Sequence, residues 1–165
     1  MRLYRVLSTA VVLLIAGALV QPAAQEGGGP GHGGERFSLG LIVGYPTGIS
    51  AKYWLAEHSA VDAALAWNFQ SERFHIHADY LHHFFEAFDV APDRLPLYLG
   101  IGGNFRVRGD APGDSVRSGI RVPLGVSFLS SELPLEAFGE VVPGLRIVPG
   151  TEFELWGGIG VRYRF

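Results

Sequence analysis

The residues with the clearest chemical character form the pattern His75-x-His77-x-Asp79. On a β-strand, alternate side chains point to one face about 7 Å apart, so these three groups could converge on a metal ion or relay a proton. The alternative is that they fill a polar interior and pair with arginine side chains. Because the motif is an isolated match, we favour the second interpretation and expect neither a metal site nor a cofactor.

A second candidate chemistry is a Ser–His–carboxylate set, because Ser71, Glu72 and His75 are close together in the sequence. An acyl hydrolase would need these groups within hydrogen-bond reach of one another. No Gly-x-Ser-x-Gly elbow supports such a site. The glycines of Gly100-x-Gly102-Gly103 fall inside an expected strand and do not form a phosphate loop. We therefore predict no catalytic residues and no enzymatic activity.

The composition excludes several other classes of protein. The 165 residues include 13 basic and 16 acidic side chains, and this balance argues against nucleic-acid binding through a basic surface. Cysteine is absent, so there is no disulfide framework, thiolate metal site or cysteine nucleophile. With 48% hydrophobic residues the chain is too apolar to be disordered. A compact, glycine-rich domain remains.

The N-terminal segment has the layout of a secretory signal peptide. Arg2 and Arg5 precede an apolar run over residues 6–20, and small residues follow it. The run is short and early for a transmembrane helix, although an uncleaved membrane anchor is the alternative. We predict a signal peptide over 1–24, a flexible glycine-rich leader over 25–36 and a folded domain over 37–165.

From Phe37 onward the hydrophobic pattern has a period of two, which is typical of β-strands. Turn residues separate eight such runs: Phe37–Val43, Ile49–Leu55, Val61–Phe69, Phe74–Tyr80 with a possible extension to His83, Leu97–Val107, Val116–Phe128, Leu135–Val141 and Phe153–Phe165. No charged residue falls on the apolar face of any run. Loops are expected at residues 45–48, 109–114 and 143–150.

Two architectures fit eight alternating strands. A soluble barrel or sandwich places the apolar face inside, whereas a membrane barrel turns it toward lipid. Three features favour the membrane barrel: glycines accompany the charges on the polar face, several runs reach the 9–11 residues that a bilayer requires, and aromatic residues lie near strand ends. These aromatic residues are Phe37, Trp67, Phe69, Phe105, Phe128, Phe153 and Phe165.

We therefore predict an all-β fold, an eight-stranded antiparallel up-and-down transmembrane β-barrel. Closure satisfies every backbone hydrogen bond in hydrocarbon, and at eight strands side chains fill the lumen. The lumen should hold a nearly balanced set of charges, as a plugged barrel requires and a selective pore does not. Its predicted members are Lys52, Arg106, Arg117, Arg121, Arg162, Arg164, Asp62, Asp79, Glu136, Glu140 and Glu154.

Two segments fit this scheme less simply. Pro123 cannot donate to a strand ladder, so we expect a bulge there or a later start of the sixth strand. Residues 82–95 fall where a short turn is expected, which suggests a longer fourth strand with a tight turn at residues 91–93. His82 and His83 are then expected at the rim of the barrel.

The chain ends with Ile159, Val161, Tyr163 and Phe165 at alternate positions. This ending resembles the C-terminal signature of bacterial outer-membrane barrels, which the barrel-assembly machinery reads. More broadly, residues 38–55, 75–82, 94–104 and 119–165 are similar to a family of small, mostly uncharacterised bacterial outer-membrane barrels. The resemblance implies the outer membrane of a Gram-negative-type bacterium as the location and supplies no catalytic residues.

We therefore expect a small, monomeric outer-membrane barrel whose role is structural or interactive, and which is not an open pore. Its expected partners are outer-membrane lipids and, through Tyr163 and Phe165, the assembly machinery; nucleic acid is not among them. One alternative is an enzyme that modifies outer-membrane lipid. The other is a secreted soluble barrel that binds an apolar ligand, which requires Leu124, Val126 and Val161 to point inward.

Overall fold

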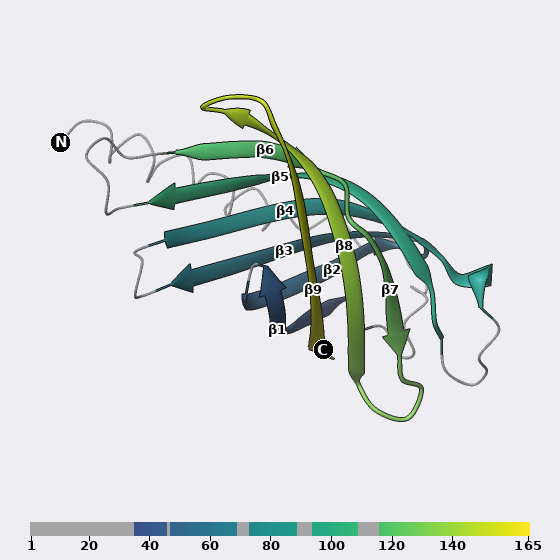
Figure 1. Ribbon diagram of the computed structural model, residues 1–165. Coiled ribbons are helices and arrows are strands. Elements are labelled where there is room, and N and C mark those ends of the chain that lie inside the picture. The colour runs from purple at the N-terminus through teal and green to yellow at the C-terminus, as the bar shows by residue number, and fades with distance from the viewer. Residues whose placement is uncertain (1–34, 46, 69–72, 89–93, 109–115) are drawn as a thin grey trace.

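The chain folds as an all-β protein (Figure 1). The computed structural model describes residues 35–45, 47–68, 73–88, 94–108 and 116–165, apart from the side chains of residues 67, 68, 73 and 108. Its strands are β1 (Phe37–Tyr45), β2 (Gly48–Ala56), β3 (Ser59–Asn68), β4 (Arg73–Phe84), β5 (Leu97–Arg108), β6 (Arg117–Arg121), β7 (Leu124–Leu129), β8 (Leu135–Val148) and β9 (Glu152–Arg164). A short 3₁₀ turn, η2 (Phe85–Ala87), follows β4.

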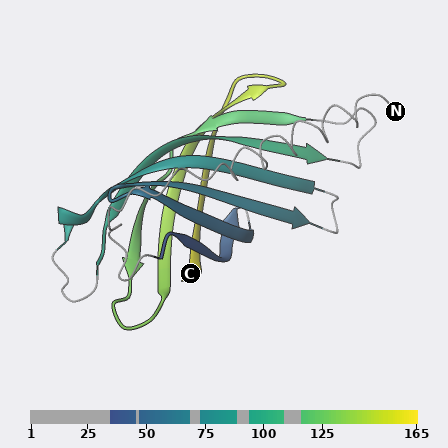
Figure 2. The ribbon, with the colours of Figure 1, turned by 180° about the vertical axis from the view of Figure 1, so that it is seen from behind.

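The strands form a closed antiparallel ring (Figures 1 and 2). Apart from β6 and β7, each strand pairs with its neighbours in sequence, and β1 pairs with β9 to close the ring, as in the registers Leu41 opposite Val161 and Gly40 opposite Arg162. Both β6 and β7 lie between β5 and β8, so together they occupy the place of one strand. The fold is therefore the predicted eight-stranded up-and-down barrel.

The expected bulge at Pro123 is not present. The pairing with β5 continues in one register, from Gly102 opposite Arg121 to Leu99 opposite Leu124. The N–H of Gly100 donates to the Pro123 carbonyl at 2.8 Å. Because proline has no N–H, the reciprocal bond is missing and the strand is interrupted without a change of register. The sixth strand begins where expected, and proline costs it one ladder bond.

Strand β8 corrects a second expectation, because it extends through the loop predicted over residues 143–150 as far as Val148. Pro143 and Gly144, which read as part of a loop, lie inside β8 and pair with Leu155 and Glu154 of β9. The Pro143 carbonyl also accepts a hydrogen bond from Val122 at 2.9 Å. Neighbouring strands on both sides therefore keep this segment extended, and a turn follows only after Val148.

The barrel is apolar outside and polar inside, as the alternation predicts. Large apolar side chains on every strand are exposed, and Ile159 is 68% accessible. The buried residues include Lys52, Asp62, Asp79, Arg121, Glu136, Arg162 and Arg164. Among the described residues no helix is long and apolar enough to cross a membrane. The lumen is thus the polar core of the molecule.

Because successive strands run in opposite directions, Phe37, Phe165 and the connections at 57–58 and 130–134 lie at one end, together with η2, and we call this the terminal end. The opposite end, the far end, holds the last residues of β1, β3, β5 and β8 and the first residues of β2, β4, β6 and β9. β1 and β2 pair on either side of the turn expected over residues 45–48, and Thr47 Oγ1 bonds the backbone of Gly44. The fourth strand extends to Phe84, longer than its core prediction.

Several expectations fall on segments outside the described residues: the signal peptide, most of the leader, the turn at 91–93 and the loop at 109–114.

Candidate functional site

The chemistry-bearing side chains gather in the lumen because period two sends every second residue of each strand inward. In β4 this places His75, His77 and Asp79 in the lumen together with Leu81 and His83. Strand β9 contributes Arg162 and Arg164 in the same way. The site is therefore built by many strands, each supplying one or two groups.

A first chain of ion pairs crosses the lumen from β2 to β8, β9 and β3. Lys52 Nζ donates to Glu136 Oε1 at 2.8 Å, and Ser127 Oγ donates to the same oxygen at 3.0 Å. Arg162 lies 3.4 Å from Glu136 and also pairs with Asp62. Glu136 is fully buried, so the groups around this carboxylate replace the water that it would otherwise bind.

A second chain of ion pairs lies beside the first. The guanidinium of Arg121 pairs with Asp79 at 3.0 Å and with Glu140 at 3.3 Å. The Tyr98 hydroxyl donates to the other oxygen of Glu140 at 3.0 Å. Two carboxylates therefore share a single arginine in this half of the lumen.

His77 lies between the two chains. Its Nε2 is 3.9 Å from Asp62 Oδ1 and 3.9 Å from Asp79 Oδ2. The three ligand-type atoms lie within 4.8 Å of one another. We call Asp62, His77 and Asp79 the His77 cluster. All three side chains are buried. Among the described residues, they form the one cluster of three or more side chains whose ligand atoms are close enough to hold a metal ion.

Aromatic rings fill much of the remaining lumen and cover its cations. Arg162 lies 3.8 Å from the ring centre of Phe138, and Lys52 lies 4.2 Å from that of Trp54. The rings fit because glycine stands on a neighbouring strand. A Cβ at Gly160 would approach Phe138 to 2.4 Å, and one at Gly125 would approach Tyr98 to 2.4 Å.

Further pairs close the lumen toward its ends. At the far end Arg106 pairs with Glu154, while Arg146 pairs with Glu152. At the terminal end Arg164 donates to the carbonyls of Ser130 and Leu133. The lumen residues predicted from sequence are therefore placed inside, except that Arg117 is exposed at the start of β6.

The structure confirms part of the interpretation of His75-x-His77-x-Asp79. All three side chains share the lumen face, and Asp79 pairs with arginine as expected. The histidines do not: within the described part of the chain, Nε2 of His75 and Nδ1 of His77 have no hydrogen-bond partner. Pairing with arginine thus accounts for the burial of the Asp79 carboxylate, but it does not account for the burial of the two imidazoles.

Sequence reasoning placed Asp62 in the lumen but not beside the His75–Asp79 motif, and it did not identify Asn104 at all. Asp62 of β3 lies directly opposite Asp79, and Asn104 of β5 lies directly opposite His77. Neither is close to the motif in the sequence. Counting the register outward from the turn between β3 and β4 would have identified Asp62, because successive residues pair across that hairpin.

Two other sequence predictions have different outcomes. Ser71 and Glu72 lie outside the described residues, so the proposed Ser–His–carboxylate set stays a prediction, while His75 itself is buried in the lumen. His83 was expected at the rim but is fully buried, 2.9 Å from Lys52 Nζ. It points inward because β4 runs on to Phe84 without a change of alternation. His82 is exposed, as expected.

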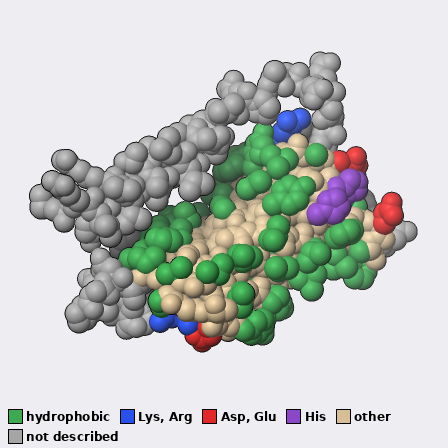
Figure 3. Space-filling view, turned by 90° about the horizontal axis from the view of Figure 1, so that it is seen from above, with side chains coloured by type: hydrophobic (Ala, Val, Ile, Leu, Met, Phe, Trp, Pro, Cys, Tyr) green, Lys and Arg blue, Asp and Glu red, His purple; other side chains and the backbone are tan. Residues whose placement is uncertain are grey.

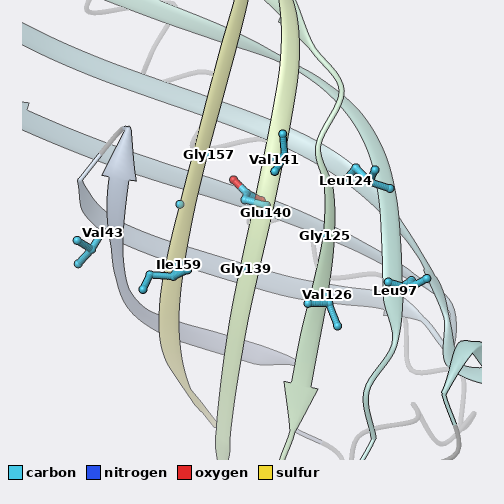
Figure 4. Close-up of a pocket in the computed structure, with 11 residues that line it drawn as sticks. Val43, Leu97, Leu124, Gly125, Val126, Gly139, Glu140, Val141, Gly157 and Ile159 are labelled. Atoms are coloured by element: carbon cyan, nitrogen blue, oxygen red, sulfur yellow. The ribbon is translucent and has the colours of Figure 1, made fainter.

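The outer surface carries a hollow over β7, β8 and β9 (Figure 4). Gly139 and Gly157 contribute no side chain there, and apolar side chains such as Val141, Leu124 and Ile159 surround them. Glu140 also borders it, although its carboxylate binds Tyr98 and Arg121 in the lumen. This hollow therefore offers apolar contacts, and its one acidic side chain is already engaged in the lumen.

Comparison with known proteins supports the architecture. No family model and no curated protein matches the chain. A solved structure that is similar is the crystal structure of the N-terminal beta-barrel domain of Pseudomonas aeruginosa OprF, with a TM-score of 0.52 and 15% sequence identity. The match covers 79% of this chain and 96% of that domain. At this level of identity the similarity shows the fold, a β-barrel.

Proposed function

We propose that this protein is a small integral outer-membrane barrel with a structural or interaction role, and that its lumen is not an open channel. The observation that carries the proposal is the inverted distribution of side chains. Exposed leucine, isoleucine, valine and aromatic residues surround a core of buried lysine, arginine, aspartate and glutamate. A bilayer makes this distribution favourable, because hydrocarbon accepts the apolar surface and the closed ring leaves no strand edge unpaired.

The outer surface supports insertion into lipid. Hydrophobic side chains are spread over the face of the barrel seen in Figure 3, and the visible charged groups lie toward its margins. Aromatic residues are exposed near strand ends, among them Phe37 and Phe165 at the terminal end and Phe153 and Tyr45 at the far end. Aromatic residues at both rims are typical of barrels that sit in a bilayer.

The lumen supports a role other than conduction. Ion pairs and aromatic rings occupy it from Arg164 at the terminal end to Arg106 and Glu154 at the far end. Ion pairs of opposite charge recur along the lumen, whereas a selective pore would present one sign of charge to its ions. We expect no steady ion current through the folded protein.

The structure does not supply what a soluble apolar-ligand barrel would need. That alternative requires Leu124 and Val161 to point inward, yet both are more than half exposed. No specific observation among the described residues favours lipid hydrolysis.

Location and partners are part of the proposal. We infer export through the N-terminal segment and contact with outer-membrane lipid, with recognition of Tyr163 and Phe165 by the assembly machinery during insertion. Both side chains are exposed at the terminal end of β9, and their rings lie 4.9 Å apart. They are thus available to a protein that reads the last strand.

The test is the behaviour of the protein in membranes and on gels. The full chain, expressed in a Gram-negative host, should fractionate with the outer membrane. Its mobility in detergent gels should change on boiling, because a folded membrane barrel resists the detergent until it is heated. Planar bilayers containing the folded protein should show no steady conductance. A water-soluble protein without a heat-dependent shift would contradict the proposal.

A further inference from the structure

We propose that the His77 cluster binds a divalent first-row transition-metal ion of the Zn²⁺ class inside the lumen. The inference depends on the barrel fold and the side-chain geometry, and it does not depend on the cellular location of the protein. It assigns a ligand to a region where buried polar atoms of His77 and Asn104 have no partner among the described ion pairs and hydrogen bonds.

The donor atoms suit such an ion. Zn²⁺ binds imidazole nitrogen and carboxylate oxygen, and sites with three protein ligands and one water are common. Ligand atoms on one tetrahedral ion lie roughly 3.4 Å apart. The separations from His77 Nε2 to Asp62 Oδ1 and Asp79 Oδ2 are both 3.9 Å, so each needs to shorten by about half an ångström, and the two carboxylate oxygens, which lie within 4.8 Å of each other, also need to approach. Side-chain rotation supplies a change of that size.

An independent observation comes from the groups around the cluster. Asn104 lies directly opposite His77 on the lumen face and is 6% exposed. Neither atom of its side-chain amide has a hydrogen-bond partner in the part of the chain that the structure describes. Buried amides are normally bonded, and an unmade bond costs about 1–3 kcal/mol. A water held by the ion would bond this amide.

The charges around the cluster also favour a cation. The connected network contains four carboxylates, Asp62, Asp79, Glu136 and Glu140, and three cations, Lys52, Arg121 and Arg162. The excess carboxylate belongs to the half in which Arg121 serves both Asp79 and Glu140. A divalent ion beside Asp79 offsets this excess negative charge and leaves one positive charge, which an ionised water ligand on the ion would neutralise. Arg121 and Arg162 would then act as outer partners that orient the two coordinating carboxylates.

The competing explanation is a proton on His77 or on a carboxylate, which would neutralise the same excess without a metal. The test uses the full chain without an affinity tag, treated with chelator and refolded in detergent with or without Zn²⁺. Zn²⁺ bound per folded chain is then measured by equilibrium dialysis. We expect one Zn²⁺ per chain, and Co²⁺ in its place should give the visible absorption of a tetrahedral site with a nitrogen ligand.

Two variants locate the site. His77→Gln should weaken Zn²⁺ binding at least about 100-fold, because it removes the nitrogen ligand. His82→Ala is the matched control, since His82 is an exposed histidine of the same strand, and it should bind within about twofold of the original protein. The heat-dependent gel shift verifies that each variant is folded.

Three results would overturn the proposal: no stoichiometric Zn²⁺ in the folded chain, equal binding by His77→Gln, or loss of binding in His82→Ala. If His77→Gln does not fold, Asp62→Asn takes its place with the same expectation. The Co²⁺ spectrum of the unmodified chain decides the matter if both variants fail to fold. A Co²⁺ spectrum typical of fully hydrated ion would then refute the site.

Discussion

At the scale of single residues, Glu136 is the carboxylate on which three side chains of the barrel interior converge. Its carboxylate receives Lys52, Ser127 and Arg162 from three different strands and is 0% exposed. A buried charge is tolerated only when it is paired, so this carboxylate and its two cations depend on one another. The consequence is that loss of one member leaves the others uncompensated.

We therefore predict that Glu136→Gln lowers the free energy of unfolding by about 3–5 kcal/mol, because Lys52 loses its buried counter-charge. The measurement is the urea midpoint of the refolded barrel in detergent. Glu152→Gln is the control: Glu152 pairs with Arg146, yet its side chain is 60% exposed, so its loss should cost less than about 1 kcal/mol. Equal effects of the two substitutions would contradict a charge-held interior.

At the scale of the strand, glycine determines which rings enter the lumen. Phe138 of β8 lies opposite Gly160 of β9, and Tyr98 of β5 lies opposite Gly125 of β7. In each pair the ring occupies the space above the glycine. The lumen glycines are thus packing residues, matched to a large neighbour across the ladder.

Gly160→Ala should destabilise the barrel by about 1–3 kcal/mol through overpacking. Its new methyl group would meet Phe138 at 2.4 Å and the Leu41 carbonyl at 2.5 Å. Gly150→Ala should change stability by less than about 0.5 kcal/mol, since no described atom lies within 4 Å of its added Cβ. Thermal unfolding of both variants in the same detergent compares them, and an unaffected Gly160→Ala would show that the ring is free to move.

Which side chains of a strand face outward was predictable from sequence, because the alternation of apolar and polar residues is a local property. Leu39, Leu41 and Val43 show it within a few residues, and the structure confirms their exposure. Register is not local. The meeting of Asp62 with Asp79, and of Asn104 with His77, depends on where two turns fall. Pro143 and Gly144 read as a loop for the same reason, since only the neighbouring strands keep them extended.

At the scale of the whole molecule, the C-terminal strand contributes to closure of the ring, and we propose that it has a second, separable role in recognition by the assembly machinery. It closes the ring, and the N–H of Phe165 donates to the Phe37 carbonyl at 2.8 Å. Its exposed terminal ring is available for recognition during assembly. The backbone bond survives truncation of the side chain, whereas recognition of the ring does not.

Phe165→Ala should reduce the amount of folded protein in the outer membrane of a Gram-negative host several-fold, while the purified chain still refolds in detergent. Phe153→Ala is the matched control, because Phe153 is an exposed aromatic residue at the other end of the same strand. It should assemble at nearly the original level. The amount of each variant assembled is measured from the heat-shifted band in membrane fractions. Equal losses in the two variants would argue against a specific role for the terminal ring.

The most direct test of the account asks which side chains face lipid. The chain has no cysteine, so Leu41→Cys, Ile159→Cys and Ser38→Cys each introduce a single thiol for a fluorescent label. In vesicles whose lipids carry a quencher, labels at 41 and 159 should be strongly quenched, and the thiol at fully buried Ser38 should not react with the label while the barrel is folded. Quenching of the Leu41 and Ile159 labels by aqueous iodide, with no effect of the lipid quencher, would contradict the account.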